Sequence, residues 1–229
     1  MAKIYIKKHN EEDAGNIFWV TMSDLMLGLA IIFITMFVFA MTGFTQSTVQ
    51  QQQEKMVVTQ KIESELQKAN INASVDKITG DIQIPATSLF SLNSYVLTNE
   101  GKKLLDKLAP IYVNTVFGNQ NLAENIENIY IQGFTDSQTF AGINSKEEQF
   151  MKNMELSLKR AQVVAEYILK TGYNKKYSEK LRQRIVVEGN SSNHPVLVNG
   201  VEDYAKSRRV EIKLEVKDWS VASAFGIKK

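Results

Sequence analysis

The stretch IFWVTMSDLMLGLAIIFITMFVFAMTGF, residues 17–44, decides how this chain is organised. Its 28 residues carry one charged side chain, that of Asp24. A helix that crosses a bilayer needs about 20 mostly apolar residues. At about 1.5 Å per residue this run reaches about 42 Å, more than the ~30 Å hydrocarbon core. We therefore expect a retained transmembrane helix over 17–44. The alternative, a signal peptide, would have a shorter apolar core and a small-residue cleavage site, which does not follow here.

The basic residues around the run predict its orientation. Lys3, Lys7 and Lys8 precede it, and the next basic residue after it is Lys55. Because cytoplasmic flanks carry an excess of Lys and Arg, we expect a cytoplasmic N-terminus over residues 1–16. The rest of the chain would then lie on the far side of the membrane.

Asp24 is the most informative residue of the run. An ionised Asp at the centre of a bilayer costs about 2.5–3.5 kcal/mol on insertion scales, so such residues usually face other helices or a water-filled path. Small residues at seven-residue intervals suit close packing of helices on the same side; they are Thr21, Gly28, Thr35 and Thr42. A plain anchor, with Asp24 near the headgroups, is the alternative. One span cannot enclose an ion path, so an ion-carrying role would require further copies or another membrane protein.

The composition excludes several classes of function. The net charge is +2, from 27 basic and 25 acidic side chains, which gives no electrostatic case for binding nucleic acid. No cysteine is present, so disulfide scaffolds, thiolate metal sites and cysteine nucleophiles are excluded. His9 and His194 lie on opposite sides of the span and cannot share a site. We expect no catalytic residues, no metal site and no cofactor, and hence no enzyme.

The remainder of the chain divides into a linker, a domain and a tail. Residues 45–70 contain neither Pro nor Gly and include Gln50 to Gln53, which favours a helical linker. Residues 71–217 predict one domain with a mixed sheet and helices on one face, and 218–229 form a C-terminal tail. We expect a hairpin over 72–84, strands over 125–133, 182–188 and 208–216, a helix capped by Thr98, and a helix over 147–170 that Gly172 ends.

Three stretches of the outer domain resemble OmpA-like peptidoglycan-binding domains, in that family's order. They are LFSLNSYVLTNEGKKLLDKLAP at 89–110, IQGFTDSQ at 131–138 with NMELSLKRAQVVAEYIL at 153–169, and SRRVEI at 207–212. The run WVTMSDLM at 19–26 resembles the ion-carrying helix of MotB-type stator subunits, and its Ser23 to Met26 segment is most similar to the MotB-like ZorB subunits of Zorya phage-defence systems. The resemblance implies an α+β chain: one transmembrane helix followed by an OmpA-like domain.

The resemblance also implies residue roles. Asp24 would carry a proton or a sodium ion. Asp136 would pair with the ammonium group of a peptidoglycan diamino acid, and Arg160 would hold its carboxylate, as a guanidinium can. The same pocket would be shaped by Thr135, Asn153 and Ser157. The alternative is structural: an internal salt bridge between Asp136 and Arg160, with Asn153 and Ser157 capping a helix.

The function that the resemblance implies is that of a peptidoglycan-anchored B subunit in an ion-driven rotary motor. Such a subunit is a single-pass protein of the bacterial inner membrane with a periplasmic C-terminal domain. It forms a homodimer inside a ring of a multi-span A-type partner, similar to MotA or ZorA. Zorya phage defence is the expected setting. A flagellar MotB-type stator subunit and a passive tether from membrane to wall, without ion flux, are the alternatives.

Overall fold

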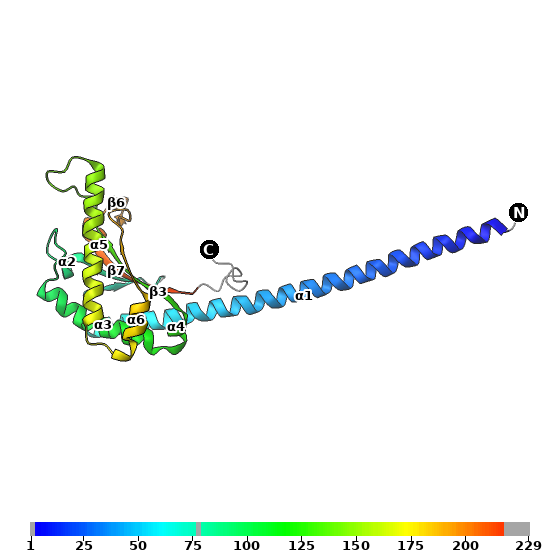
Figure 1. Cartoon of the computed structure of the whole chain (residues 1–229), viewed down its shortest axis with the longest axis horizontal. Helices are drawn as coiled ribbons and strands as arrows, with labels where there is room; N and C mark the ends of the chain where they lie inside the picture. The colour runs from blue at the N-terminus through cyan, green and yellow to red at the C-terminus, as the bar shows by residue number, and fades with distance from the viewer. Residues whose placement is uncertain (1–2, 77–78, 218–229) are drawn as a thin grey trace. The chain divides into compact units, whose positions relative to one another are not determined.

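A computed structural model describes the backbone of residues 3–76 and 79–217, and the side chains of 16–42, 53–76 and 79–217 (Figure 1). The expected tail over 218–229 lies outside these residues. The chain divides into two compact units, and the second comprises Gln50–Asp218. Helix α1 runs from Lys3 to Lys68 and includes residues 45–68 of the expected linker. Within α1, the 27 residues Asn16–Thr42 include an 18-residue stretch with a mean hydropathy of 2.5 and are long and apolar enough to cross a membrane.

The second unit is built on a five-stranded mixed sheet, as the sequence predicts. The strand order is β1-β2-β7-β3-β4, in which β3 and β4 are parallel and the other pairs are antiparallel. The strands are β1 (Ser74–Val75), β2 (Ile82–Pro85), β3 (Ile126–Phe134), β4 (Ile185–Gly189) and β7 (Arg209–Val216). A separate small hairpin pairs β5 (Leu197–Val198) with β6 (Val201–Glu202).

Two long helices supply most of the helical layer. They are α3 (Asn99–Gly118) and α5 (Lys146–Lys170). Thr98 caps α3 as predicted, because its side chain accepts a hydrogen bond of 2.9 Å from the N–H of Gly101. The shorter helical segments are α2 (Ala86–Leu89), α4 (Gln120–Asn125), the 3-10 turn η1 (Lys175–Tyr177), α6 (Ser178–Arg184) and α7 (Tyr204–Ser207).

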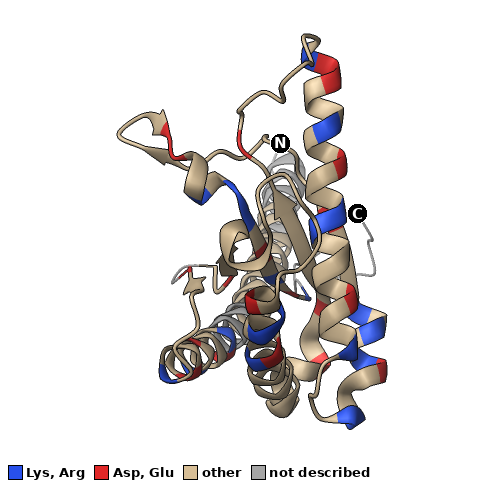
Figure 2. Cartoon of the chain, turned by 90° about the vertical axis from the view of Figure 1, so that its left-hand side faces the viewer, with Lys and Arg blue, Asp and Glu red and all other residues tan. Residues whose placement is uncertain are grey.

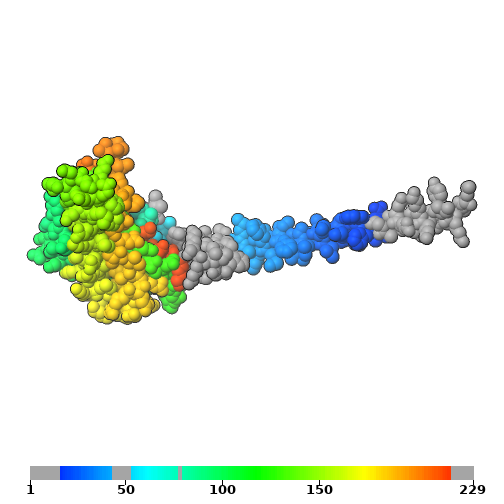
Figure 3. All heavy atoms as spheres, turned by 45° about the horizontal axis from the view of Figure 1, so that its top comes forward, coloured from blue at the N-terminus to red at the C-terminus, as the bar shows by residue number. Residues whose placement is uncertain are grey.

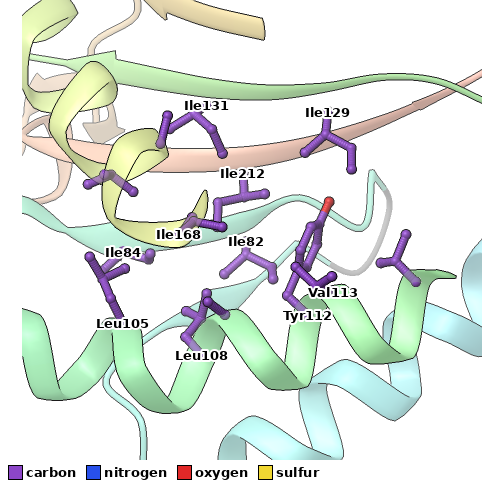
Figure 4. Packing of buried hydrophobic residues seen from close by; sticks show 14 of the residues in the cluster. Ile82, Ile84, Leu105, Leu108, Tyr112, Val113, Ile129, Ile131, Ile168 and Ile212 are labelled. Carbon is purple, nitrogen blue, oxygen red and sulfur yellow. The ribbon is translucent and has the colours of Figure 1, made fainter. Parts of the chain in front are cut away.

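The core lies between one face of the sheet and these helices (Figure 4). Alternate residues of each strand point into it, since successive side chains of a strand face opposite ways. The sheet contributes Ile82, Ile84, Ile129, Ile131 and Ile212, and the helices contribute Leu105, Leu108, Val113 and Ile168, all of them buried.

The last turns of α1 belong to this core. Val58, Ile62 and Leu66 are 4%, 3% and 2% exposed. Their spacing of four residues places them on one helix face, which packs into the domain. The folded unit therefore begins at Gln50, about twenty residues before the domain boundary expected from the sequence.

One local prediction is wrong. Residues 182–184, expected as the start of a strand, complete α6, because that helix buries Leu181 and the strand starts only at Ile185. Helix α5 ends at Lys170, as predicted, and Gly172 follows its C-cap without a positive φ. Thr171 is the C-cap in an extended conformation, and its hydroxyl donates to the carbonyl of Tyr167 at 2.7 Å.

Candidate functional site

The site forms where parallel strands β3 and β4 end side by side. Thr135 and Asp136 follow β3 directly, while Asn190 and Ser191 follow β4. The N–H of Thr135 donates to the carbonyl of Ser191 at 2.9 Å, and the N–H of Asn190 donates to that of Gly133 at 2.9 Å. These bonds extend the pairing past the ends of the strands, so the backbone beneath Asp136 is held in place.

Helix α5 crosses the same two strands at very short range. A Cβ on Gly133 would collide with the backbone of Ser157, and one on Gly189 would come within 2.7 Å of the N of Leu158. Only glycine permits this approach at both positions. The close approach brings Asn153 and Arg160 of α5 beside the end of β3.

A cavity of about 280 Å³ lies at this place. It unites four of the five residues predicted for the peptidoglycan pocket, namely Thr135, Asp136, Asn153 and Arg160, of which each is buried. Its other lining residues are Leu92, Asn93, Gln138, Thr139, Phe140, Ala141, Leu156 and Arg208.

Ser157, the fifth predicted residue, does not line the cavity. Its hydroxyl donates to the carbonyl of Met154 at 2.9 Å and accepts from the N–H of Ser191 at 3.1 Å. It therefore joins α5 to the loop after β4 and supports the site from behind. The helix-cap alternative for Asn153 and Ser157 is wrong, because both lie inside α5, whose N-cap is Ser145.

Arg160 reaches the cavity from a buried position, with 3% of the residue exposed. Its Nε donates to the carbonyl of Ser94 at 2.9 Å, and its guanidinium lies 5.5 Å from the centre of the Phe90 ring. Its Nη1 is buried and has no hydrogen-bond partner among the described residues. Burial first, and then the charge of Arg208, lower the pKa of Arg160 to about 10, while Asp136 opposes the shift. Arg160 thus remains a cation at neutral pH.

Asp136 forms its ion pair with Arg208, and not with Arg160 as the structural alternative expected. Arg208 also donates to the side-chain oxygen of Gln138 at 3.3 Å. Two further buried atoms at the cavity, the hydroxyl of Thr135 and the Nε of Arg208, lack a partner in the described part of the chain. The cavity therefore combines one carboxylate, two guanidinium groups and several polar atoms that can still form hydrogen bonds.

The loop after Asp136 forms one wall of the cavity. Gln149, on the first turns of α5, holds it from the side: the amide oxygen accepts from the N–H of Phe140 at 2.7 Å. The amide nitrogen donates to the carbonyls of Phe140 at 3.0 Å and Ile143 at 2.7 Å. These three bonds keep the loop at the rim and leave the cavity beside Asp136 open.

Arg208 is the main site residue that sequence reasoning missed. It stands in the SRRVEI stretch, where two successive arginines must diverge as the strand begins. Arg209 takes the other direction: its Nε donates to the carboxylate of Glu211 at 2.6 Å, and its guanidinium lies 4.1 Å from the centre of the Phe134 ring. Two successive arginines at the start of a strand were the feature of the sequence that could have indicated a site residue, because their side chains point in opposite directions and one of them can reach the end of β3.

The residues predicted within the membrane lie on α1, in the described range 16–42. The threonine hydroxyls donate to backbone carbonyls of the same helix: Thr21 to Phe18 at 2.9 Å, Thr35 to Ile32 at 2.9 Å and Thr42 to Val38 at 3.0 Å. A Cβ on Gly28 would meet nothing within 4 Å. The three threonine hydroxyls are therefore hydrogen-bonded within the helix itself. The helix side formed by Thr21, Gly28, Thr35 and Thr42 carries only small side chains.

Comparison with known proteins places these observations in context. Residues 89–209 match the OmpA family. The chain is 29% identical to Zorya protein ZorB of Escherichia coli strain Crooks, over 93% of this chain and 94% of that protein. It is 24% identical to Zorya protein ZorB of Escherichia coli O139:H28, over 92% and 85%. The periplasmic domain of Helicobacter pylori MotB superposes with a TM-score of 0.46 at 21% identity, covering 64% of this chain and 82% of that one.

Proposed function

The chain belongs to the OmpA family, and on this premise we propose that it is a single-span inner-membrane subunit whose outer domain binds peptidoglycan. The observation that carries this proposal is the buried Nη1 of Arg160, which has no partner among the described residues and lies at the cavity that also contains Asp136. A buried donor of this kind is costly unless something accepts its hydrogen bond.

The ligand class follows from the charges. Arg160 offers a donor to a carboxylate, and the carboxylate of Asp136 can accept from an ammonium group. A diamino acid of a peptidoglycan stem peptide carries both groups on one small molecule. Its ammonium would share Asp136 with Arg208, whose own Nε could bond a second ligand oxygen. We therefore assign a binding role to the outer domain, with no catalytic step.

Purified cell-wall fragments test this proposal. We expect the full chain in detergent to be retained by the fragments, and Arg160→Lys or Asp136→Asn to weaken retention about 10- to 100-fold, which is the usual effect of losing a hydrogen bond to a charged group. Arg182→Lys and Glu155→Gln are the matched controls, since both residues are exposed and lie outside the cavity. Retention that is equal in all five proteins would reject the pocket.

We further propose that Asp24 carries the ion in the B subunit of an ion-driven motor. Its position within the 27-residue apolar segment Asn16–Thr42 supports this. Placing an ionised carboxylate in the bilayer costs free energy, so acidic residues in membrane spans usually have a function. A membrane potential supplies about 2.3 kcal/mol per charge per 100 mV, several times the thermal energy. Two copies of the chain inside a ring of an A-type multi-span partner would provide the walls of the ion path.

The setting we propose is phage defence of the Zorya type. The similarity to two proteins named Zorya protein ZorB extends over more than nine-tenths of this chain, which favours that setting over a flagellar one. Asp24→Asn, co-expressed with the A-type partner, should abolish proton or sodium flux and phage protection while wall binding persists. If the chain is a passive tether, Asp24→Asn should leave phage protection unchanged, whereas Arg160→Lys should reduce it. Full phage protection by Asp24→Asn would therefore reject the ion-carrying role and favour the passive tether.

A further inference from the structure

A strongly basic surface covers the end of α5 and the segment that follows it. Residues 170–184 contain six Lys or Arg and one acid, Glu179, for a net charge of +5. Because the whole chain has a net charge of +2, the other residues together carry −3. Figure 2 shows Lys and Arg gathered on this part of the chain. We call this surface the basic face; its members are Lys170, Lys175, Lys176, Lys180, Arg182 and Arg184.

Most of these charges are exposed and uncompensated. The four lysines are exposed and form no ion pair within the described residues, and Arg182 reaches Glu179 only at 4.0 Å. The backbone beneath them is fixed. Tyr177 stacks on Phe117 with ring centres 5.7 Å apart, and Leu181 is buried. The fold thus presents a preformed cluster of cations rather than a flexible basic tail.

The basic face and the cavity lie at opposite ends of β3. Arg184 donates to the carbonyl of Ile126, the first residue of that strand, while Thr135 and Asp136 follow its last residue. Nine residues of strand span about 30 Å. A ligand in the cavity would therefore leave the basic face free.

The chain enters the folded unit at the same end as the basic face. Helix α4 immediately precedes Ile126, and the side chain of Asn121 in α4 donates to the carboxylate of Glu54 in α1 at 3.2 Å. Glu54 follows Thr42, the last residue of the apolar segment, by twelve residues. Even a fully extended chain of that length spans only about 40 Å. The covalent connection therefore limits the distance between Glu54 and the end of the apolar segment to at most about 40 Å.

We propose that the basic face binds anionic phospholipid headgroups of the membrane in which the apolar helix of the same chain is inserted. Lysine and arginine clusters next to a span are attracted to anionic lipid surfaces, and the covalent connection raises the effective concentration of such lipids at the face. This inference rests on the insertion of the helix and not on the peptidoglycan site.

Energy transfer to labelled lipids tests the contact. Because the chain has no cysteine, Gln183→Cys on exposed α6 gives a unique site for a donor dye, attached with a membrane-impermeant reagent to outward-facing full-length protein in vesicles. The acceptor is a headgroup-labelled lipid. We expect at least about twofold higher transfer in phosphatidylcholine vesicles with about 30 mol% phosphatidylglycerol than in phosphatidylcholine alone, and loss of the difference at about 0.5 M salt.

Charge reversal provides the decisive variant. The triple change Lys175→Glu, Lys176→Glu and Lys180→Glu should remove the lipid-dependent transfer. The same reversal at three exposed lysines of α3 should preserve it; they are Lys102, Lys103 and Lys107. A donor at Asn144→Cys, in the loop at the cavity end, should show low transfer on both vesicle types.

Two results would overturn the inference. One is equal transfer from Gln183→Cys on neutral and anionic vesicles. The other is a triple reversal that leaves lipid-dependent transfer intact but weakens retention by cell-wall fragments, which would assign the basic face to the wall. Loss of retention in Arg160→Lys alone would not affect the lipid result, so failure of the two proposals can be distinguished.

Discussion

Arg208 donates through Nη1 to the Oδ2 of Asp136, so the ion pair at the cavity is made by an arginine 72 positions further along the chain. Arg160, the arginine that the sequence motif assigns to the same pocket, donates instead to the carbonyl of Ser94. The two cations therefore have different tasks. Arg208 pairs with the carboxylate, whereas the Nη1 of Arg160 is buried without a partner among the described residues.

This division of tasks predicts a measurable coupling. The side chains of Arg208 and Asp136 are 21% and 10% exposed, so Arg208→Gln leaves a largely buried carboxylate with less compensation and should lower the free energy of unfolding by about 1–3 kcal/mol. Arg208→Gln combined with Asp136→Asn should cost less than the sum of the single changes. Urea unfolding of the four proteins measures the coupling, and strictly additive losses would contradict the ion pair.

Gly133→Ala should disturb both stability and binding. The added Cβ would collide with the backbone of Ser157, so α5 must move away from β3. We expect a loss of about 1–3 kcal/mol and weaker retention by wall fragments, because Asn153 and Arg160 move with the helix. Gly172→Ala is the matched control, since its Cβ would meet nothing within 4 Å. Equal thermal midpoints for the two variants would show that the contact is unimportant.

Ile62→Ala tests whether the end of α1 belongs to the folded unit. Ile62 is 3% exposed, and its truncation should cost about 2–4 kcal/mol through lost burial and a cavity. Met56→Ala, on the exposed side of the same helix at 52% exposure, should stay within about 0.5 kcal/mol of the parent. Denaturant unfolding in detergent compares them. An unchanged denaturant midpoint for Ile62→Ala would indicate that the folded unit begins near residue 71, as the sequence predicts, and that the end of α1 is not part of it.

Gln149→Ala should loosen the wall of the cavity without unfolding the domain. The variant loses three hydrogen bonds to Phe140 and Ile143, each worth about 0.5–1.5 kcal/mol. We expect faster hydrogen exchange over residues 138–145 and weaker wall binding. Gln162→Ala is the control, because that amide only meets the exposed Glu166 on the same helix, at 2.9 Å. Unchanged exchange in the loop would argue that Gln149 does not hold it.

Much of the architecture follows from local patterns. The apolar segment, the alternating strands β3 and β7, and the cap at Thr98 were all predicted, because each depends on residues close together in the sequence. Predictions from local patterns failed where packing against residues distant in the sequence decided the structure. Residues 182–184 read as strand, yet the burial of Leu181 extends α6 through them. The linker was predicted only as a helix, yet its residues Val58, Ile62 and Leu66 complete the core of the domain.

The sequence by itself determined the apolar segment, and its resemblance to OmpA-like domains implied a shared pocket for Thr135, Asp136, Asn153, Ser157 and Arg160, of which all but Ser157 line one cavity. Hydropathy and motif spacing are properties of the chain and need no coordinates. Only the tertiary structure decided which arginine meets Asp136. The antiparallel register pairs Phe134 of β3 with Arg209 of β7, which sets the preceding residue, Arg208, beside Asp136. That register is a long-range property, fixed by the burial of whole strands rather than by any neighbouring residue.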